Sequence, residues 1–131
     1  MITGGRVVSV EATKKSEEQI QGMDVFINID KLEAGGENLT ISYTYNIDYR
    51  PGIASMKIRG EVLSSESNSS EIMEKWKKTG ELPQNFTEEL LGAITYTASA
   101  IGTLLAFSLN IAAPINIPRP RIQMPSSPSA S

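Results

Sequence analysis

The side chains that most often carry chemistry are scarce in this sequence. It contains no histidine and no cysteine, which excludes histidine-based acid–base catalysis, thiol chemistry, disulfides and the usual structural zinc sites. Carboxylate pairs remain, but Asp24 and Asp30 lie on one expected strand at a separation of about 20 Å. Glu88 and Glu89 fall at an expected helix start, where the helix dipole accounts for acidic residues. The sequence therefore predicts a protein that is not an enzyme.

Loop signatures for phosphate and calcium are missing as well. Ala34-Gly35-Gly36 lacks the lysine and the serine or threonine of a phosphate-binding loop. The stretch from Asp30 to Glu37 lacks aspartate or asparagine at the next two alternate positions, which a calcium-binding loop requires. We therefore expect no cofactor and no metal. The net charge of −3 also gives no attraction to nucleic acid, so nucleic acid is not an expected partner.

Alternating side chains predict four strands in the first half of the chain. Residues 39–49 alternate between apolar or aromatic side chains and small polar ones, which is typical of a long half-buried strand. Arg50-Pro51-Gly52 supplies a turn, and residues 53–63 alternate again, so the two runs form a hairpin. Residues 23–32 and 6–12 provide two further strands. Their short connections predict an antiparallel meander with one polar face and one face that needs cover.

Two helices are expected to provide that cover. Residues 71–79 form a short helix that ends at Gly80. Asn85, followed by Glu88, resembles a capping box and begins a long helix that ends at Asn110. The side of this helix that faces the sheet is expected to carry Leu90, Leu91, Ile94, Ala98, Ile101, Leu104, Leu105 and Leu109. The predicted fold class is α+β: a four-stranded antiparallel meander sheet followed by a short and a long helix packing on it.

The back of the long helix predicts self-association. A helix that covers a sheet on one side normally carries charged residues on its other side, but here the back has only small ones. We therefore expect a second subunit to cover this back, in a homo-oligomer that is a dimer or a tetramer. The predicted oligomer interface consists of Gly92, Ala93, Thr95, Ser99, Gly102, Thr103 and Ala106.

Residues 90–118 contain no charged residue and are long enough for a membrane span, which needs about 20 residues. Threonine, serine and asparagine interrupt the run, and a span would leave the apolar face of the sheet bare. We therefore expect a buried helix and no integral membrane span. The N-terminus lacks the features of a secretory signal, so a cytoplasmic location is expected. One domain is predicted over residues 1–124, with a disordered tail over 125–131.

Two segments resemble a known family. Residues 96–118, YTASAIGTLLAFSLNIAAPINIP, are similar to its pattern of a helix that opens near an aromatic residue, an apolar stretch and a proline-containing loop. Leu109, Pro114 and Asn116 occupy the characteristic places of that pattern. Residues 74–83, EKWKKTGELP, look like an insertion in archaeal relatives. Together with the order of strands and helices, these segments resemble the SecB-like export chaperones, in particular an archaeal-type SecB-like protein.

The resemblance implies an oligomeric protein that binds non-native polypeptide. The chain departs from the family in two respects. The helix that follows the proline-containing loop in the family is replaced here by PRPRIQMPSSPSAS, and the acidic partner-binding surface of the export chaperone cannot be placed on this sequence. Docking to a translocase motor and pairing with a toxin–antitoxin system therefore both stay open.

A protein that binds unfolded polypeptide needs accessible apolar and aromatic side chains on a rigid scaffold. The candidates for polypeptide binding are Phe26, Tyr43, Tyr45, Tyr49, Trp76, Ile115 and Ile117. Packing in the core is the competing interpretation for each of them, above all for Tyr43.

The first functional hypothesis is an ATP-independent molecular chaperone, a holdase that binds unfolded or hydrophobic polypeptide segments, with protein export as one setting. The alternative is a structural or adaptor subunit of a homo-oligomer that binds one specific folded partner. A carrier of an apolar ligand is a third hypothesis.

Overall fold

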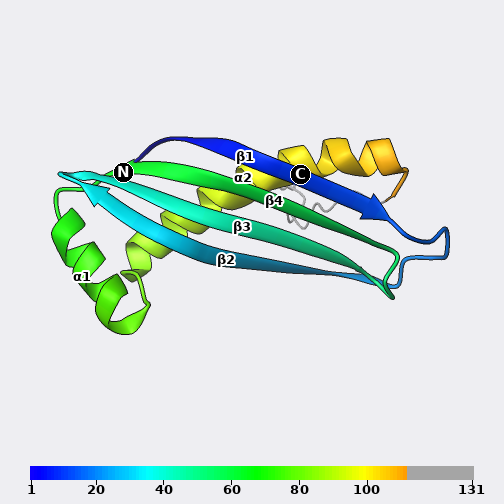
Figure 1. Cartoon of the computed structure of the whole chain (residues 1–131), viewed down its shortest axis with the longest axis horizontal. Helices are drawn as coiled ribbons and strands as arrows, with labels where there is room; N and C mark the ends of the chain where they lie inside the picture. The colour runs from blue at the N-terminus through cyan, green and yellow to red at the C-terminus, as the bar shows by residue number, and fades with distance from the viewer. Residues whose placement is uncertain (112–131) are drawn as a thin grey trace, which may run out of the picture.

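The computed structural model describes residues 1–111 and contains four strands followed by two helices (Figure 1). The strands are β1 (Ile2–Lys14), β2 (Gly22–Gly35), β3 (Asn38–Arg50) and β4 (Ala54–Ser65). The helices are α1 (Ser69–Thr79) and α2 (Gln84–Leu109). The predicted α+β class, with one antiparallel sheet and then a short and a long helix, is confirmed.

The order of the strands corrects the predicted meander. β2, β3 and β4 pair in succession, but β1 pairs with β4, so the sheet has the order β1-β4-β3-β2. This arrangement is a Greek key, in which one strand returns beside the far strand of a three-stranded meander. The connection at residues 15–21 can make this crossing because three strand spacings amount to only about 14 Å.

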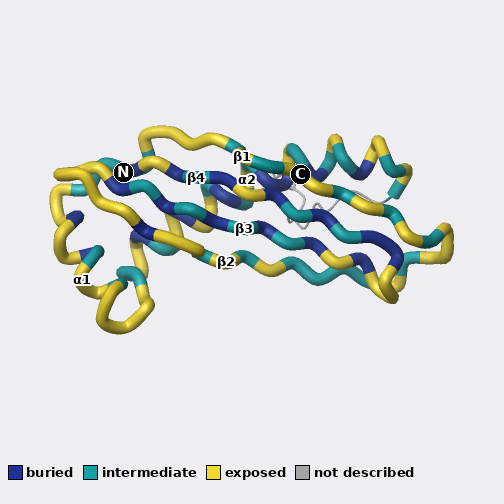
Figure 2. Tube along the Cα trace, in the orientation of Figure 1, coloured by how far each residue is buried: buried dark blue, intermediate teal, exposed yellow. Residues whose placement is uncertain are grey.

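One face of the sheet carries the hydrophobic core, and the other is largely polar. Alternate residues of β3 are between 0% and 4% exposed: Leu39, Ile41, Tyr43, Tyr45, Ile47 and Tyr49. The residues between them, such as Thr44 and Asn46, lie on the polar face and are half-buried. Burial is concentrated in β3 and β4, the two central strands, because a neighbour lies on each side of them (Figure 2).

Helix α1 packs at the end of the sheet where β2 and β3 are joined. Its Ser69 hydroxyl donates a hydrogen bond to the Gly36 carbonyl over 2.6 Å, and Ile72 is 1% exposed. Gly80 follows the helix in the left-handed region, at φ 69°, and its N–H donates to the Trp76 carbonyl. The prediction that Gly80 ends this helix is confirmed, because glycine adopts this conformation without steric cost.

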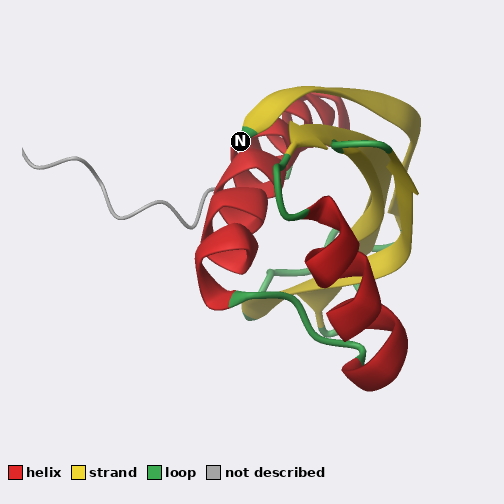
Figure 3. Ribbon diagram, turned by 90° about the vertical axis from the view of Figure 1, so that its left-hand side faces the viewer, coloured by secondary structure: helices red, strands yellow, loops and turns green. Residues whose placement is uncertain are grey.

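Helix α2 crosses the core face of the sheet, and its last turns extend past the edge strand β1 (Figures 1 and 3). It begins after Pro83, whose carbonyl accepts a hydrogen bond from the Thr87 N–H over 2.9 Å. The predicted capping box at Asn85 is therefore wrong: Asn85 already lies inside the helix, and no side chain caps its start. By length and composition α2 could cross a membrane, and 33% of its most apolar window is buried inside the protein.

Candidate functional site

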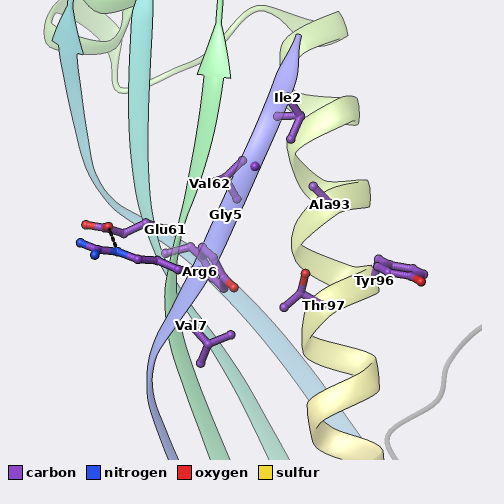
Figure 4. A pocket seen from close by; sticks show the side chains of 11 residues that line it. Ile2, Gly5, Arg6, Val7, Glu61, Val62, Ala93, Tyr96 and Thr97 are labelled. Carbon is purple, nitrogen blue, oxygen red and sulfur yellow. Dashed lines mark hydrogen bonds and ion pairs between the residues drawn. The ribbon is translucent and has the colours of Figure 1, made fainter.

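An open apolar groove of about 350 Å³ lies between the edge strand β1 and helix α2 (Figure 4). Ile2, Gly5 and Val7 of β1 form one wall, and Ala93, Tyr96 and Thr97 of α2 form the other. Tyr43 and Val62 also line it, and both are almost completely buried. The groove is therefore a gap between two elements that are not in full contact, over a rigid base.

Glycines shape the groove because they let the strands and an aromatic ring come close together. Gly60 lies directly opposite Tyr43 in the β3–β4 pairing. A Cβ atom at Gly60 would be only 2.6 Å from the Tyr43 hydroxyl oxygen and 2.6 Å from the Arg6 carbonyl oxygen. The Tyr43 ring thus occupies the space that a side chain at Gly60 would take. A Cβ atom at Gly5 would likewise lie 2.9 Å from the Glu61 carbonyl oxygen.

The only charged residues that line this groove, among those the structure describes, are Arg6 and Glu61. Their side chains form an ion pair with 2.7 Å between Nε and Oε1, on paired positions of β1 and β4 (Figure 4). Since the Arg6 side chain is 72% exposed, this pair contributes little to folding stability. It leaves the groove close to electrically neutral, with hydrogen-bonding groups at one point of its rim.

The outer side of α2 carries large apolar residues, which corrects the prediction of a small-residue back. Tyr96 is 81% exposed, Leu104 67% and Phe107 75%. With the exposed Ala100 between them, they recur at intervals of four, four and three residues, so they share one side of the helix. We call Tyr96, Ala100, Leu104 and Phe107 the α2 stripe. Tyr96 belongs to this stripe and to the groove.

The small residues predicted at the oligomer interface divide into two groups. Ser99, Gly102 and Ala106 are buried against the protein's own sheet, so they are not available to a second subunit. Gly92 is exposed, and Ala93, Thr95 and Thr103 are half-buried. Ser99 lies against a large residue of the sheet, since its side chain forms a hydrogen bond with Tyr45 of β3.

The aromatic residues predicted to bind polypeptide are not brought together. Tyr43, Tyr45 and Tyr49 are between 1% and 4% exposed and belong to the core. Phe26 is 54% exposed, but it pairs with Asn46 on the polar face of the sheet, away from the groove. Trp76 is half-buried on α1 and packs against the core.

Ile115, Ile117 and the tail 125–131 lie outside the described residues. The sequence did not reveal Ile2 or Tyr96 as groove residues, and it assigned Ala93 to the predicted oligomer interface. One feature of the sequence pointed to this site: Tyr96 is a large aromatic residue on the side of the helix for which only small residues are predicted.

Burial perturbs the tyrosines beneath α2. Burial raises the pKa of Tyr43 and of Tyr45 above the ordinary value of 10.0, and a side-chain hydrogen bond with Ser99 opposes the rise at Tyr45. Burial, together with repulsion from Tyr45, raises the pKa of Tyr49 to about 12. Among residues 1–111, no group of three or more aspartate or glutamate residues could hold a metal ion. The site therefore offers apolar contact and a few hydrogen-bonding groups.

No protein-family model matches the chain, and no curated protein sequence matches it. A solved structure is similar to it: the Mycobacterium tuberculosis SecB-like chaperone Rv1957 in complex with a ChAD peptide from the Rv1956 HigA1 antitoxin. The TM-score is 0.60 at 10% sequence identity, over 86% of this chain and 82% of the other. The sheet of four antiparallel strands and its two helices therefore have the fold of a SecB-like chaperone.

Proposed function

We propose that this protein is an ATP-independent holdase that binds extended, apolar segments of non-native polypeptide in the groove between β1 and α2. The observation that carries the proposal is the groove itself, an apolar gap over a buried base of Tyr43 and Val62. A rigid base and open sides are what a binder of many sequences requires, because apolar contact depends on area and not on direction.

The dimensions of the groove favour a short segment over a folded surface. A volume of about 350 Å³ is near the lower end for ligand sites, which run from about 300 to 1,000 Å³. It accommodates a few side chains from an extended chain. Tyr96 lies at the rim and is 81% exposed, and a tyrosine supplies apolar area with little loss of conformational entropy on binding.

The proposed assembly is a homo-oligomer, a dimer or a tetramer, held by Leu104 and Phe107 at the C-terminal end of the α2 stripe, which leaves Tyr96 to the groove. Leu104 and Phe107 are two large apolar residues on one exposed helix side. An exposed apolar side of this kind is a liability in a monomer and is typical of an interface. Among the residues of α2, only Glu88 and Glu89 are charged, so the helix has no basic residue that would favour an anionic membrane surface.

The structural neighbour supports the binding of peptide by this fold, since the Mycobacterium tuberculosis chaperone was solved with a peptide from an antitoxin. At 10% identity the likeness does not identify the client. The proposal therefore covers a role in protein export and a role beside a toxin–antitoxin pair. A cytoplasmic location and the lack of enzymatic activity are parts of the same proposal.

The test is a single charge placed in the groove. Ala93→Glu adds a carboxylate to the α2 wall, and a bound apolar segment would have to desolvate it at a cost of several kcal/mol. The matched control is Gln84→Glu, which adds the same charge at an exposed position of the same helix. We expect the parent and the control to suppress aggregation of a denatured client in light scattering, and Ala93→Glu to lose at least tenfold in potency.

Equal potency of Ala93→Glu and Gln84→Glu would remove the groove as the client site. A failure of the parent protein to delay aggregation at any ratio would remove the holdase function.

The second candidate function is an adaptor for one specific partner. The peptide in the similar structure comes from one particular protein, an antitoxin, which is the observation that favours this alternative. Binding constants for several unrelated unfolded proteins separate the two functions. Similar micromolar values for all of them support the holdase, and measurable binding of one partner alone supports the adaptor.

A further inference from the structure

Two of the buried tyrosines of β3 differ in how their hydroxyl groups are bonded. Tyr43 and Tyr45 lie on the core face of the sheet and are 2% and 4% exposed. The Tyr45 hydroxyl forms a hydrogen bond with Ser99 of α2. The Tyr43 hydroxyl has no hydrogen-bond partner among residues 1–111. A buried tyrosine hydroxyl usually has one, so the free hydroxyl of Tyr43 requires an explanation.

The packing around Gly60 fixes the position of this hydroxyl. The Tyr43 hydroxyl oxygen and the Arg6 carbonyl oxygen each lie 2.6 Å from the point that a Cβ atom of Gly60 would occupy. The two oxygens are therefore no farther apart than twice this distance. Since β4 separates β3 from β1, the Tyr43 ring extends across β4 at Gly60 and brings its hydroxyl close to the backbone of β1.

The hydroxyl end of Tyr43 is the part of this residue that reaches the groove. Among the described residues that line the groove, Tyr43 alone comes from β3, and the others come from β1, β4 and α2. Because β3 lies on the far side of β4, only the outer end of the ring extends this far. The base of an apolar groove thus contains one hydrogen-bonding group that the protein itself does not use.

A second free hydroxyl lies on the opposite wall. Thr97 points from α2 toward β1 (Figure 4). The hydroxyls of Thr87, Thr103 and Ser108 in the same helix donate to the carbonyl four residues earlier, as helical serine and threonine often do. The Thr97 hydroxyl makes no hydrogen bond within residues 1–111. The groove therefore presents hydroxyl groups from two sides between its apolar surfaces.

We propose that the Tyr43 hydroxyl donates a hydrogen bond to a backbone carbonyl of the polypeptide segment that binds in the groove. This inference rests on the proposed function, because it assigns a residue to the binding of clients. Every residue of a polypeptide has a carbonyl group, so this hydrogen bond is available to any sequence whose side chains suit the groove walls. It positions the backbone of the client and does not select its sequence.

The surroundings of the hydroxyl favour a neutral acceptor. Burial raises the pKa of Tyr43 above 10.0, so the hydroxyl keeps its proton at neutral pH and can donate. Arg6 is the one cation among the described residues that line the groove, and it is already paired with Glu61. The groove therefore has no unpaired cation for an anionic ligand. A ligand without any acceptor would bury the hydroxyl unpaired, which weakens its binding.

The first experiment removes the hydroxyl and keeps the ring. Tyr43→Phe is compared with Tyr45→Phe, the matched control on the same strand, because Tyr45 does not line the groove. The probe is a short peptide of leucine and alanine flanked by lysines, and fluorescence anisotropy measures its affinity. We expect Tyr43→Phe to bind it about five- to tenfold more weakly than the parent protein, because the carbonyl enters an apolar site without a donor. Tyr45→Phe should bind it as the parent does.

Urea denaturation of the same variants should give the opposite ranking. Tyr45→Phe lowers the urea midpoint, because Ser99 loses its partner. Tyr43→Phe leaves the midpoint unchanged or raises it, because no hydrogen bond within the protein is lost. A midpoint that falls as far in Tyr43→Phe as in Tyr45→Phe would show that the hydroxyl is bonded inside the protein, and would overturn the inference.

The second experiment identifies the acceptor on the peptide. Each amide of the peptide is replaced in turn by a carbon–carbon double bond, which keeps the extended shape and removes the carbonyl. At one position we expect the parent protein to lose about tenfold in affinity and Tyr43→Phe to lose little, because its donor is already missing. Such coupling between two changes isolates one interaction. Equal losses in the two proteins at every position would contradict a bond from Tyr43 to the backbone.

The outcomes separate this inference from the proposed function. If the parent protein binds no apolar peptide, both are overturned. If the parent and Tyr43→Phe bind the peptide equally, the role of the hydroxyl is overturned and the holdase function stands. If Tyr43→Phe associates with itself more weakly in sedimentation velocity while its peptide affinity is unchanged, the hydroxyl bonds to a second copy of the chain, and the inference is overturned as well.

Discussion

Phe107 provides the sharpest test of how this protein assembles, because this residue of the α2 stripe is 75% exposed. A phenylalanine has about 200 Å² to bury, so about 150 Å² of apolar area is available to a partner. At about 25 cal/mol per Å², complete burial would contribute about 4 kcal/mol per copy. If an interface covers half of that area, Phe107→Ser costs about 4 kcal/mol over the two copies of a dimer.

The corresponding change in the dissociation constant is nearly a thousandfold, at about 1.4 kcal/mol for each factor of ten. Sedimentation velocity over a range of micromolar concentrations measures it directly. We expect the parent protein to associate in this range and Phe107→Ser to sediment as a monomer. The free energy of unfolding of the monomer should change by no more than about 0.5 kcal/mol, because the ring makes few contacts within its own chain.

Ser108→Ala is the matched control, since Ser108 is the next residue of the same helix and is exposed. It should leave the association constant unchanged. A monomeric parent protein at all concentrations would refute the reasoning, as would equal association of the parent and Phe107→Ser. Loss of folding in Phe107→Ser would show that the ring is more buried than the structure indicates.

Two further predictions concern the stability of the fold. Gly60→Ala should destabilise the protein by about 2 kcal/mol, because the new methyl group collides with the Tyr43 ring and cannot be accommodated without a backbone shift. Gly92→Ala should instead stabilise the protein by up to about 1 kcal/mol, because this helix position has open space around it. Chemical denaturation measures the free energy of unfolding of both variants, and equal effects of the two substitutions would contradict the packing described. Because the pKa of Tyr49 is raised from 10.0 to about 12, the unfolded chain loses this proton first as the pH rises. Stability is then fully present below pH 10 and decreases by about 3 kcal/mol as the pH rises toward 12. The urea midpoint should decrease over this range, less so in Tyr49→Phe, and equal slopes in the two proteins would contradict the assignment.

Several elements of the fold were predictable because their causes are local. The alternation in residues 39–49 arises from the two-residue repeat of a strand, and β3 appears over Asn38–Arg50. Gly80 ends α1 and Asn110 ends α2, both in the left-handed conformation, because few other residues tolerate it. By contrast, the capping box at Asn85 was wrong, since the Pro83 carbonyl two residues earlier already accepts the first helical hydrogen bond.

The order of the strands was not predictable from alternation. A half-buried strand has the same pattern whichever strand lies beside it, so the pattern at residues 6–12 does not distinguish β2 from β4 as a partner. Pairing of β1 with β4 depends on contacts between residues about fifty positions apart. That choice also creates the candidate site, because it places the glycines of β1 next to α2.

The sequence by itself determined which kinds of chemistry are absent and which segments form strands and helices. The lack of histidine and cysteine excludes whole classes of mechanism, and local geometry sets the period of each element. Only the tertiary structure decided which side of α2 lies on the sheet. Both sides are apolar, so hydrophobic periodicity alone could not choose. The fold buries Ala98, Gly102 and Ala106 against the rest of the protein and leaves Tyr96, Leu104 and Phe107 exposed on the other side of the helix.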